Sequence, residues 1–176
     1  MGVEGEVSRL YFDALGEVLP SEIYSGGRSR RPPKDIFNAF LSYGYGVLYS
    51  EIERACVVSG LDPYLGFLHA DRHGRVSLVL DLIEEFRQAI VDRAMVTLAV
   101  RRQMSMEDAD KFGNEFLLNS KGKRKVIETL MQRFNTKVKY GGKKLRFRDI
   151  ILAQARRITR FLNGDSRRYK PFVHRW

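Results

Sequence analysis

Apolar residues recur every three or four positions over long stretches of this chain, which is the spacing of an amphipathic helix. The first such pattern covers residues 7–18, and Pro20 ends it. A breaker-rich segment, residues 21–33, separates it from a longer pattern over residues 35–59. That pattern begins with an aspartate, a favourable N-cap, and Gly60 follows its end. We therefore expect two helices joined by a long loop in the first third of the chain.

The rest of the chain predicts further helices and one small hairpin. Residues 77–102 carry apolar side chains around much of the helix circumference, so we expect this long helix to be central and the most buried. The stretch at 136–147 alternates and turns at Gly141-Gly142, as a two-stranded hairpin does. Shorter helices are predicted at residues 107–111, 123–134 and 149–162. With no internal repeat and no sign of a second domain, the sequence predicts an all-α, single multi-helix domain over residues 1–176, with one small β-hairpin.

Two glycines, Gly44 and Gly46, lie in the aromatic middle of the helix predicted at 35–59. A glycine inside a helix costs about 1 kcal/mol relative to alanine. We expect the close approach of a neighbouring element or of a substrate to compensate for this cost, because a Cβ would then be in the way.

Net charge narrows the range of functions. The 176 residues include 31 Lys and Arg against 21 Asp and Glu, which gives a net charge of +10 and a pI near 9.9. Such an excess attracts polyanions and favours nucleic acid as the ligand, although an inert basic surface or an acidic protein partner is the alternative. No apolar run approaches the ~20 residues of a membrane-spanning helix, and Cys56 lies among small apolar residues, as a buried thiol would. We expect a cytoplasmic protein that does not bind a membrane.

His69 and the carboxylates that follow it are the first candidates for chemistry. His69 ends an apolar run, where a histidine most often has a structural role, but Asp81, Glu84 and Glu85 follow on the helix predicted to be buried. Residues three or four apart share a helix face, and like charges there are unfavourable unless a cation compensates. A divalent metal bound by imidazole and carboxylate would supply that cation. The alternative is that these carboxylates face solvent or pair with arginines such as Arg87, and spacing alone leaves the two possibilities even.

Glu4 is a further candidate, although its place at the start of the first helix favours a role in capping that helix. Other phosphate-handling motifs are missing: the chain has no GxxxxGK[ST], no GxGxxG after a strand, no CxxC pair and no serine in a nucleophile-elbow context. A metal held by histidine and carboxylates on a basic protein could activate an oxygen nucleophile at a phosphodiester.

Several separated strings of the chain resemble one known family. Residues 60–87, GLDPYLGFLHADRHGRVSLVLDLIEEFR, closely resemble the signature region of CRISPR-associated protein 1, the integrase of CRISPR adaptation. MGVEG at the start is similar to the family's glutamate motif, RRPPKDIFNAFLSYGYGVLYSEIE to its long middle helix, and YKPFVHRW to its closing segment. These motifs occur in the family's order and together cover essentially the whole chain.

The resemblance implies a metal-dependent DNA endonuclease and integrase. In that family Mn²⁺ or Mg²⁺ is bound at positions that match Glu4, His69 and Glu84, and Asp81 would support or complete the site. The reaction is attack by the 3′-hydroxyl of a short captured duplex on a phosphodiester of the repeat array, which inserts the duplex as a new spacer. Double-stranded and branched DNA, CRISPR-associated protein 2 and a second copy of the full-length protein are the implied partners. The family's N-terminal β domain is not contained in this chain, which is similar to the C-terminal helical domain alone.

Basic residues outside the implied metal site are candidates for contacts with DNA phosphates, although each alone is more readily explained as a solvated charge. They are Arg28, Arg30, Arg31, Arg72, Arg75, Lys143 and Lys144. Asn38 and Tyr49 match polar positions of the family's middle helix and could line the cleft or serve in packing. The competing hypotheses are a helical DNA-binding module without catalysis and a scaffold whose acidic cluster is an ion-pair network.

Overall fold

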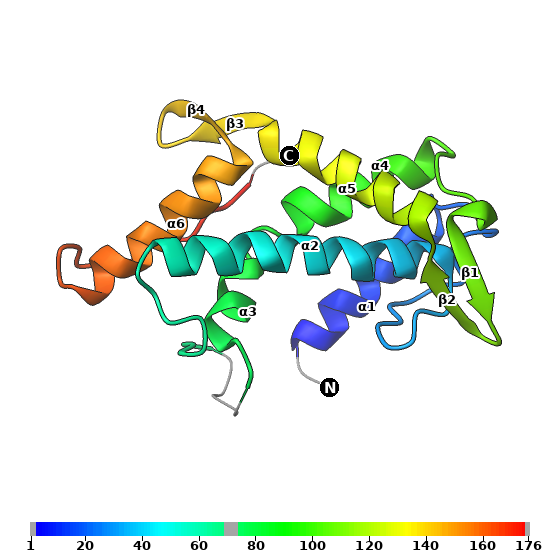
Figure 1. The fold of residues 1–176 in the computed structure, drawn as a ribbon, viewed down its shortest axis with the longest axis horizontal. Helices are drawn as coiled ribbons and strands as arrows, with labels where there is room; N and C mark the ends of the chain where they lie inside the picture. The colour runs from blue at the N-terminus through cyan, green and yellow to red at the C-terminus, as the bar shows by residue number, and fades with distance from the viewer. Residues whose placement is uncertain (1–2, 69–73, 175–176) are drawn as a thin grey trace. The chain divides into compact units, whose positions relative to one another are not determined.

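A computed structural model of the chain describes residues 3–68 and 74–174, with side chains described from Gly5 onward. This part of the chain folds into six α-helices and two small antiparallel hairpins (Figure 1), which confirms the all-α prediction. The α-helices are α1 (Val3–Gly16), α2 (Ile36–Val58), α3 (Ser77–Ile83), α4 (Arg93–Val100), α5 (Ser120–Asn135) and α6 (Phe147–Leu162). The strands are β1 (Ala109–Phe112), β2 (Glu115–Leu118), β3 (Lys137–Tyr140) and β4 (Lys143–Arg146), and two short helices are η1 (Arg87–Asp92) and η2 (Met106–Asp108).

Contacts between residues divide the chain into two compact units. The first contains residues 1–44 and 92–129, and the second contains residues 45–91 and 130–176. Each unit combines two stretches that are far apart in the sequence, so neither is a contiguous segment that could be read off the chain. The residues predicted to hold a metal beyond Glu4 all belong to the second unit.

In the first unit, the loop between α1 and α2 contributes to the core. Ile23 and Tyr24 are buried, and the Tyr24 hydroxyl donates a 2.8 Å hydrogen bond to the carbonyl oxygen of Phe12. Asp35 caps α2 as predicted, because its Oδ1 accepts a 2.7 Å hydrogen bond from the backbone N–H of Asn38. The breaker-rich loop is therefore ordered by buried side chains near its start and by a cap at its end.

The helix predicted at 107–111 is wrong. Only η2 is helical there, and the chain continues as β1, turns at Gly113-Asn114, and returns as β2 with Phe112 paired to Glu115. Gly113 has a φ of +58°, the left-handed conformation that two-residue hairpin turns require. The sequence did not predict this second hairpin, because the Gly-Asn turn is flanked by short strands with mostly exposed side chains.

The second unit has an apolar core to which the end of α2, α3 and α6 all contribute. Leu48, Leu82, Phe86 and Phe147 are fully or almost fully buried in it, and α6 packs on the β3–β4 hairpin. That hairpin turns at the two glycines as predicted, with Tyr140 paired to Lys143. The helices predicted at 123–134 and 149–162 are confirmed to within a few residues, as α5 and α6.

The single long helix predicted at 77–102 is broken into three pieces. It is helical as α3, then turns, then continues as the π-helix η1 and as α4. In the turn, the backbone N–H groups of Glu85 and Phe86 bond the carbonyls three residues back, of Leu82 and Ile83. The apolar pattern did predict the burial of this segment correctly. It could not show the break, because i→i−3 and i→i−5 bonds keep nearly the same face inward.

Gly46 and Cys56 test two smaller expectations. Apart from the backbone of its own helix and its chain neighbours, no described atom lies within 4 Å of where a Cβ at Gly46 would be. No described neighbouring element therefore explains this glycine, and the close approach of a substrate stays a prediction. Cys56 is fully buried, as expected, and burial raises the pKa of its thiol to about 11. Among the described residues, no helix has the length and apolarity needed to cross a bilayer.

Candidate metal centre

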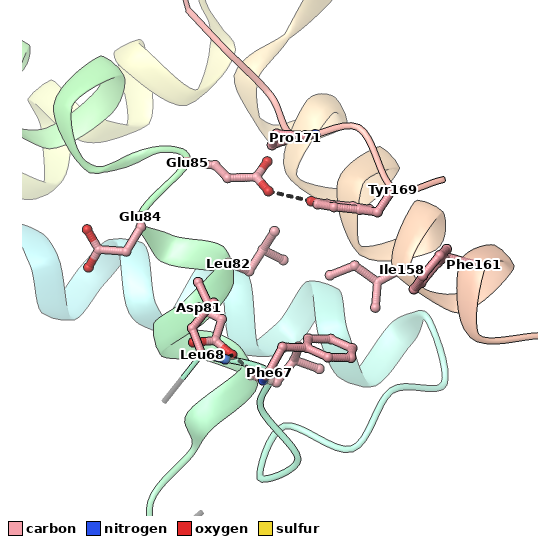
Figure 2. Close-up of a pocket in the computed structure, with 11 residues that line it drawn as sticks. Phe67, Leu68, Asp81, Leu82, Glu84, Glu85, Ile158, Phe161, Tyr169 and Pro171 are labelled. Atoms are coloured by element: carbon pink, nitrogen blue, oxygen red, sulfur yellow. Dashed lines mark hydrogen bonds between the residues drawn. The ribbon is translucent and has the colours of Figure 1, made fainter. Parts of the chain in front are cut away.

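Asp81 fixes the chain immediately before His69. Its Oδ2 accepts hydrogen bonds from the backbone N–H groups of Phe67 (2.5 Å) and Leu68 (3.0 Å), shown as dashed lines in Figure 2. The N–H of Leu78, at the start of α3, also bonds the carbonyl of Pro63 at 3.0 Å. The segment 63–68 is thus attached to α3 at both of its ends. His69 lies outside the described residues, but the residue before it is anchored to the helix that precedes Glu84.

Gly66 has no space for a side chain. A Cβ there would lie 2.6 Å from the Cβ of Ser77 and 2.9 Å from Oδ2 of Asp81, closer than real Cβ contacts. Because Ser77 is fully buried in the first turn of α3, it cannot move aside. Glycine at this position lets the segment lie directly against the helix, and so permits the Asp81 hydrogen bonds.

Among the three carboxylates, Glu84 is the one that can exchange its present partner, Arg87, for another cation. It follows the last residue of α3, its side chain is 47% exposed, and it forms one 2.6 Å ion pair with Arg87. The Arg87 guanidinium also lies 4.6 Å from the centre of the Tyr45 ring, a cation–π contact. The pair is partly exposed, at 47% for the Glu84 side chain and 25% for that of Arg87, and such a pair contributes on the order of 1 kcal/mol. A metal ion or a phosphate can therefore take either partner at small cost.

Glu85 is fully engaged elsewhere and is not available as a ligand. Its Oε2 accepts hydrogen bonds from Nε2 of Gln154 (2.7 Å) and from the backbone N–H of Phe172 (2.8 Å), and its Oε1 accepts one from the Tyr169 hydroxyl. Burial, and next the hydrogen bond to Glu85, raise the pKa of Tyr169, so its hydroxyl stays a donor. Figure 2 shows Glu84 and Glu85 pointing to different sides of the turn.

These contacts compensate the like charges whose crowding on one helix face suggested a metal. Asp81, Glu84 and Glu85 each have their own compensating partners, so repulsion between them does not require a metal. For Glu84 the structure shows the alternative weighed from the sequence, the pair with Arg87. Within residues 3–68 and 74–174 no three metal-binding side chains come together, but two of the three implied ligands, His69 and the side chain of Glu4, lie outside what is described. The residues that are described fit a metal through Glu84, whose oxygens are accessible, with Asp81 holding the loop that leads to His69.

An apolar pocket lies beside these carboxylates. Its volume is about 500 Å³, and it is bounded by α3, α6, the segment before His69 and the C-terminal segment (Figure 2). Leu68 is 85% exposed and Phe67 58% exposed at its edge, an unusual degree of exposure for large apolar side chains. Its lining residues are Phe67, Leu68, Leu78, Asp81, Leu82, Glu84, Glu85, Ile158, Phe161, Tyr169 and Pro171.

The predicted DNA contacts differ in how accessible they are. Arg28 is directed inward, where its guanidinium donates to Oδ1 of Asn38 (2.9 Å), to Oγ of Ser42 (3.0 Å) and to the carbonyl of Ser29. The side chains of Arg30, Arg31, Lys143 and Lys144 are exposed, Arg75 is partly buried, and Arg72 lies outside the described residues.

The two residues for which the sequence allows either a place in the cleft or a packing role differ in burial. Asn38 is 0% exposed, and its amide donates to the carbonyl of Gly27 (3.1 Å) and to Asp35 (2.9 Å). These are the contacts of the packing role that was the alternative for Asn38. Tyr49 is partly buried, and this burial raises the pKa of its hydroxyl. The negative charge of Glu53 raises the same pKa by a smaller amount.

Comparison with known proteins identifies the family. The sequence profile of the family described as "CRISPR associated protein Cas1" matches residues 1–132 of this chain. A CRISPR-associated endonuclease Cas1 of Archaeoglobus fulgidus is 42% identical over 182 aligned positions, which include 100% of this chain and 52% of that protein. The chain belongs to the Cas1 family.

Two solved structures share the fold. A casposase bound to integration product matches with a TM-score of 0.89 and 31% identity over 98% of this chain and 50% of the other. A chain of a partial Cas6-RT-Cas1–Cas2 complex matches with a TM-score of 0.80 and 25% identity over 97% of this chain and 51% of the other. This chain spans about half the length of the relatives it matches.

Proposed function

We propose that this chain is the catalytic helical part of a Cas1-type DNA integrase and endonuclease that depends on Mn²⁺ or Mg²⁺. The observation that supports this most is the pairing of an exchangeable carboxylate, Glu84, with a loop that Asp81 attaches to α3 directly before His69. Membership of the Cas1 family and the similarity to a casposase bound to integration product support the same reaction class.

In this proposal each residue has a defined task. Glu4, His69 and Glu84 hold the ion, and Asp81 keeps the loop of His69 in place through its two backbone hydrogen bonds. A bound divalent ion would lower the pKa of the attacking 3′-hydroxyl and neutralise charge on the scissile phosphate. Arg87, paired with Glu84 in the structure, would be released when that carboxylate binds the ion and would then contact a phosphate oxygen.

Basic side chains and partner proteins complete the proposal. Arg30, Arg31, Lys143 and Lys144 are exposed cations that contact DNA backbones without reading sequence. The similarity to a Cas1–Cas2 complex supports Cas2 as a partner of the full-length protein, together with a second copy of itself. The net charge of +10 supports the competing function, a DNA-binding module without catalysis, as much as it supports this proposal.

The test is an assay of the chain on DNA. We expect Mn²⁺-dependent cleavage or joining of branched DNA, and of duplex DNA with a free 3′-hydroxyl, and no product when EDTA is present. DNA binding that weakens with salt, measured in the same buffers, shows that the protein is folded and engaged. If the chain binds DNA in that way and yields no product with either ion, the binding-module function replaces the proposal.

A further inference from the structure

The turn that carries Glu84 is held from outside itself as well as by local bonds. The N–H groups of Glu85 and Phe86 bond the carbonyls of Leu82 and Ile83, and the Phe86 carbonyl accepts a 2.9 Å hydrogen bond from the N–H of Ile90. The two residues after Glu84 are also attached to the C-terminal segment at 169–172. Glu85 accepts hydrogen bonds from it, and the Phe86 ring stacks on that of Phe172 at 5.3 Å and 15°.

This attachment is buried and specific. Gln154 of α6 is 0% exposed and joins the two parts, because its Nε2 lies 2.7 Å from Glu85 Oε2 and 3.2 Å from both the Tyr169 hydroxyl and the carbonyl of Lys170. The Tyr140 hydroxyl donates to the other end of the same amide, at 2.8 Å from Oε1. A partly buried carboxylate with three donors is costly to disturb, since any lost donor leaves charge without compensation.

We infer that Glu85 is a positioning residue for Glu84, and that Tyr169, Gln154 and the backbone N–H of Phe172 form the clamp through which it acts. The clamp offers no metal ligand of its own. It fixes the direction of the turn, so that the Glu84 carboxylate points away from Glu85 and from the C-terminal segment (Figure 2). The inference rests on the proposed function, since it concerns how Glu84 is presented to the ion.

Two variants test the clamp. Tyr169→Phe removes one hydroxyl donor to Glu85, and Glu85→Gln places an amide among donors; neither touches Glu84. We expect both to raise the Mn²⁺ concentration for half-maximal activity by about tenfold or more, the usual effect of losing a group that orients a metal ligand. Salt-dependent DNA binding should stay within about twofold of the parent, because no exposed cation is changed.

The matched control is Tyr24→Phe. Tyr24 is buried, whereas Tyr169 is partly buried, and it too donates its hydroxyl to an oxygen, that of the Phe12 carbonyl, in the first unit. It should lower the midpoint of thermal unfolding about as much as Tyr169→Phe and leave the Mn²⁺ dependence unchanged. An equal Mn²⁺ shift in Tyr24→Phe, or no shift in the two clamp variants, overturns the positioning role while the parent's activity stands. A parent that neither binds Mn²⁺ nor acts on DNA overturns the proposed function, and the clamp's role with it.

Discussion

Replacing Glu84 with glutamine is expected to lower the rate of metal-dependent DNA cleavage and joining by more than about a thousandfold, several kcal/mol of lost transition-state stabilisation. The amide is a weak ligand for a hard divalent ion and carries no charge. Because Glu84 is half exposed and its ion pair with Arg87 contributes little, the free energy of unfolding should change by less than about 1 kcal/mol. DNA binding should stay the same or tighten, since a negative charge has been removed.

Asp149→Asn is the control for this substitution. Asp149 also pairs with an arginine three residues away, Arg146, at 2.8 Å and with 40% exposure, and its removal changes the net charge by the same amount. It should cleave and join DNA at the parental rate. Glu84→Gln with near-parental activity would mean that another carboxylate holds the ion, and the first to examine would then be Asp81.

Replacing Gly66 with alanine is expected to be the most damaging substitution among residues that have no chemistry of their own. The new Cβ would overlap Ser77 and Asp81, so the segment 63–68 must move off α3 and lose its hydrogen bonds to Asp81. Overpacking of this kind costs about 1–3 kcal/mol of folding free energy. Because His69 follows this segment directly, activity should fall by about a hundredfold, more than the stability loss accounts for.

The same substitution at Gly46 serves as the comparison for Gly66→Ala. Gly46 also lies in the second unit, within α2, but no described atom would be near its Cβ. Gly46→Ala should raise the free energy of unfolding by up to about 1 kcal/mol, as alanine does in an exposed helix. Urea denaturation of both variants measures the two changes in the free energy of unfolding, which we expect to be an increase for Gly46→Ala and a decrease for Gly66→Ala. A Gly66→Ala protein as stable and as active as the parent would show that the loop is not held against α3 as described.

Local patterns in the sequence predicted α1, α2, α5 and α6 well, because each of these helices has its own apolar face and, for α2, its own cap. The break in the long helix at 84–86 was not predictable in this way. It depends on Glu85 and Phe86 meeting the C-terminal segment more than eighty residues later, and no local pattern encodes that contact. The missed hairpin had a local signal, the Gly113-Asn114 turn, which was overlooked because its strands bury little.

The three acidic residues after His69 show the same limit for the site. Spacing alone placed them together and could not say which one is available to a ligand. Their partners do so: backbone N–H groups for Asp81, a partly exposed ion pair for Glu84, and a partly buried clamp for Glu85. Only Arg87 had a sequence signal, its position three residues after Glu84, which is typical of a helical ion pair. The close approach at Gly66 had none, because a glycine in a loop is ordinary.

The most direct measurement of the central claim, that His69 and Glu84 hold a divalent ion, is the binding of Mn²⁺ to the protein without DNA, followed by electron paramagnetic resonance. The parent should bind one Mn²⁺ per chain with saturable affinity. His69→Ala and Glu84→Gln should each weaken that affinity by about tenfold or more, while Asp149→Asn leaves it unchanged. A parent that binds no Mn²⁺, or a pair of site variants that bind it as tightly as the parent, would contradict the account.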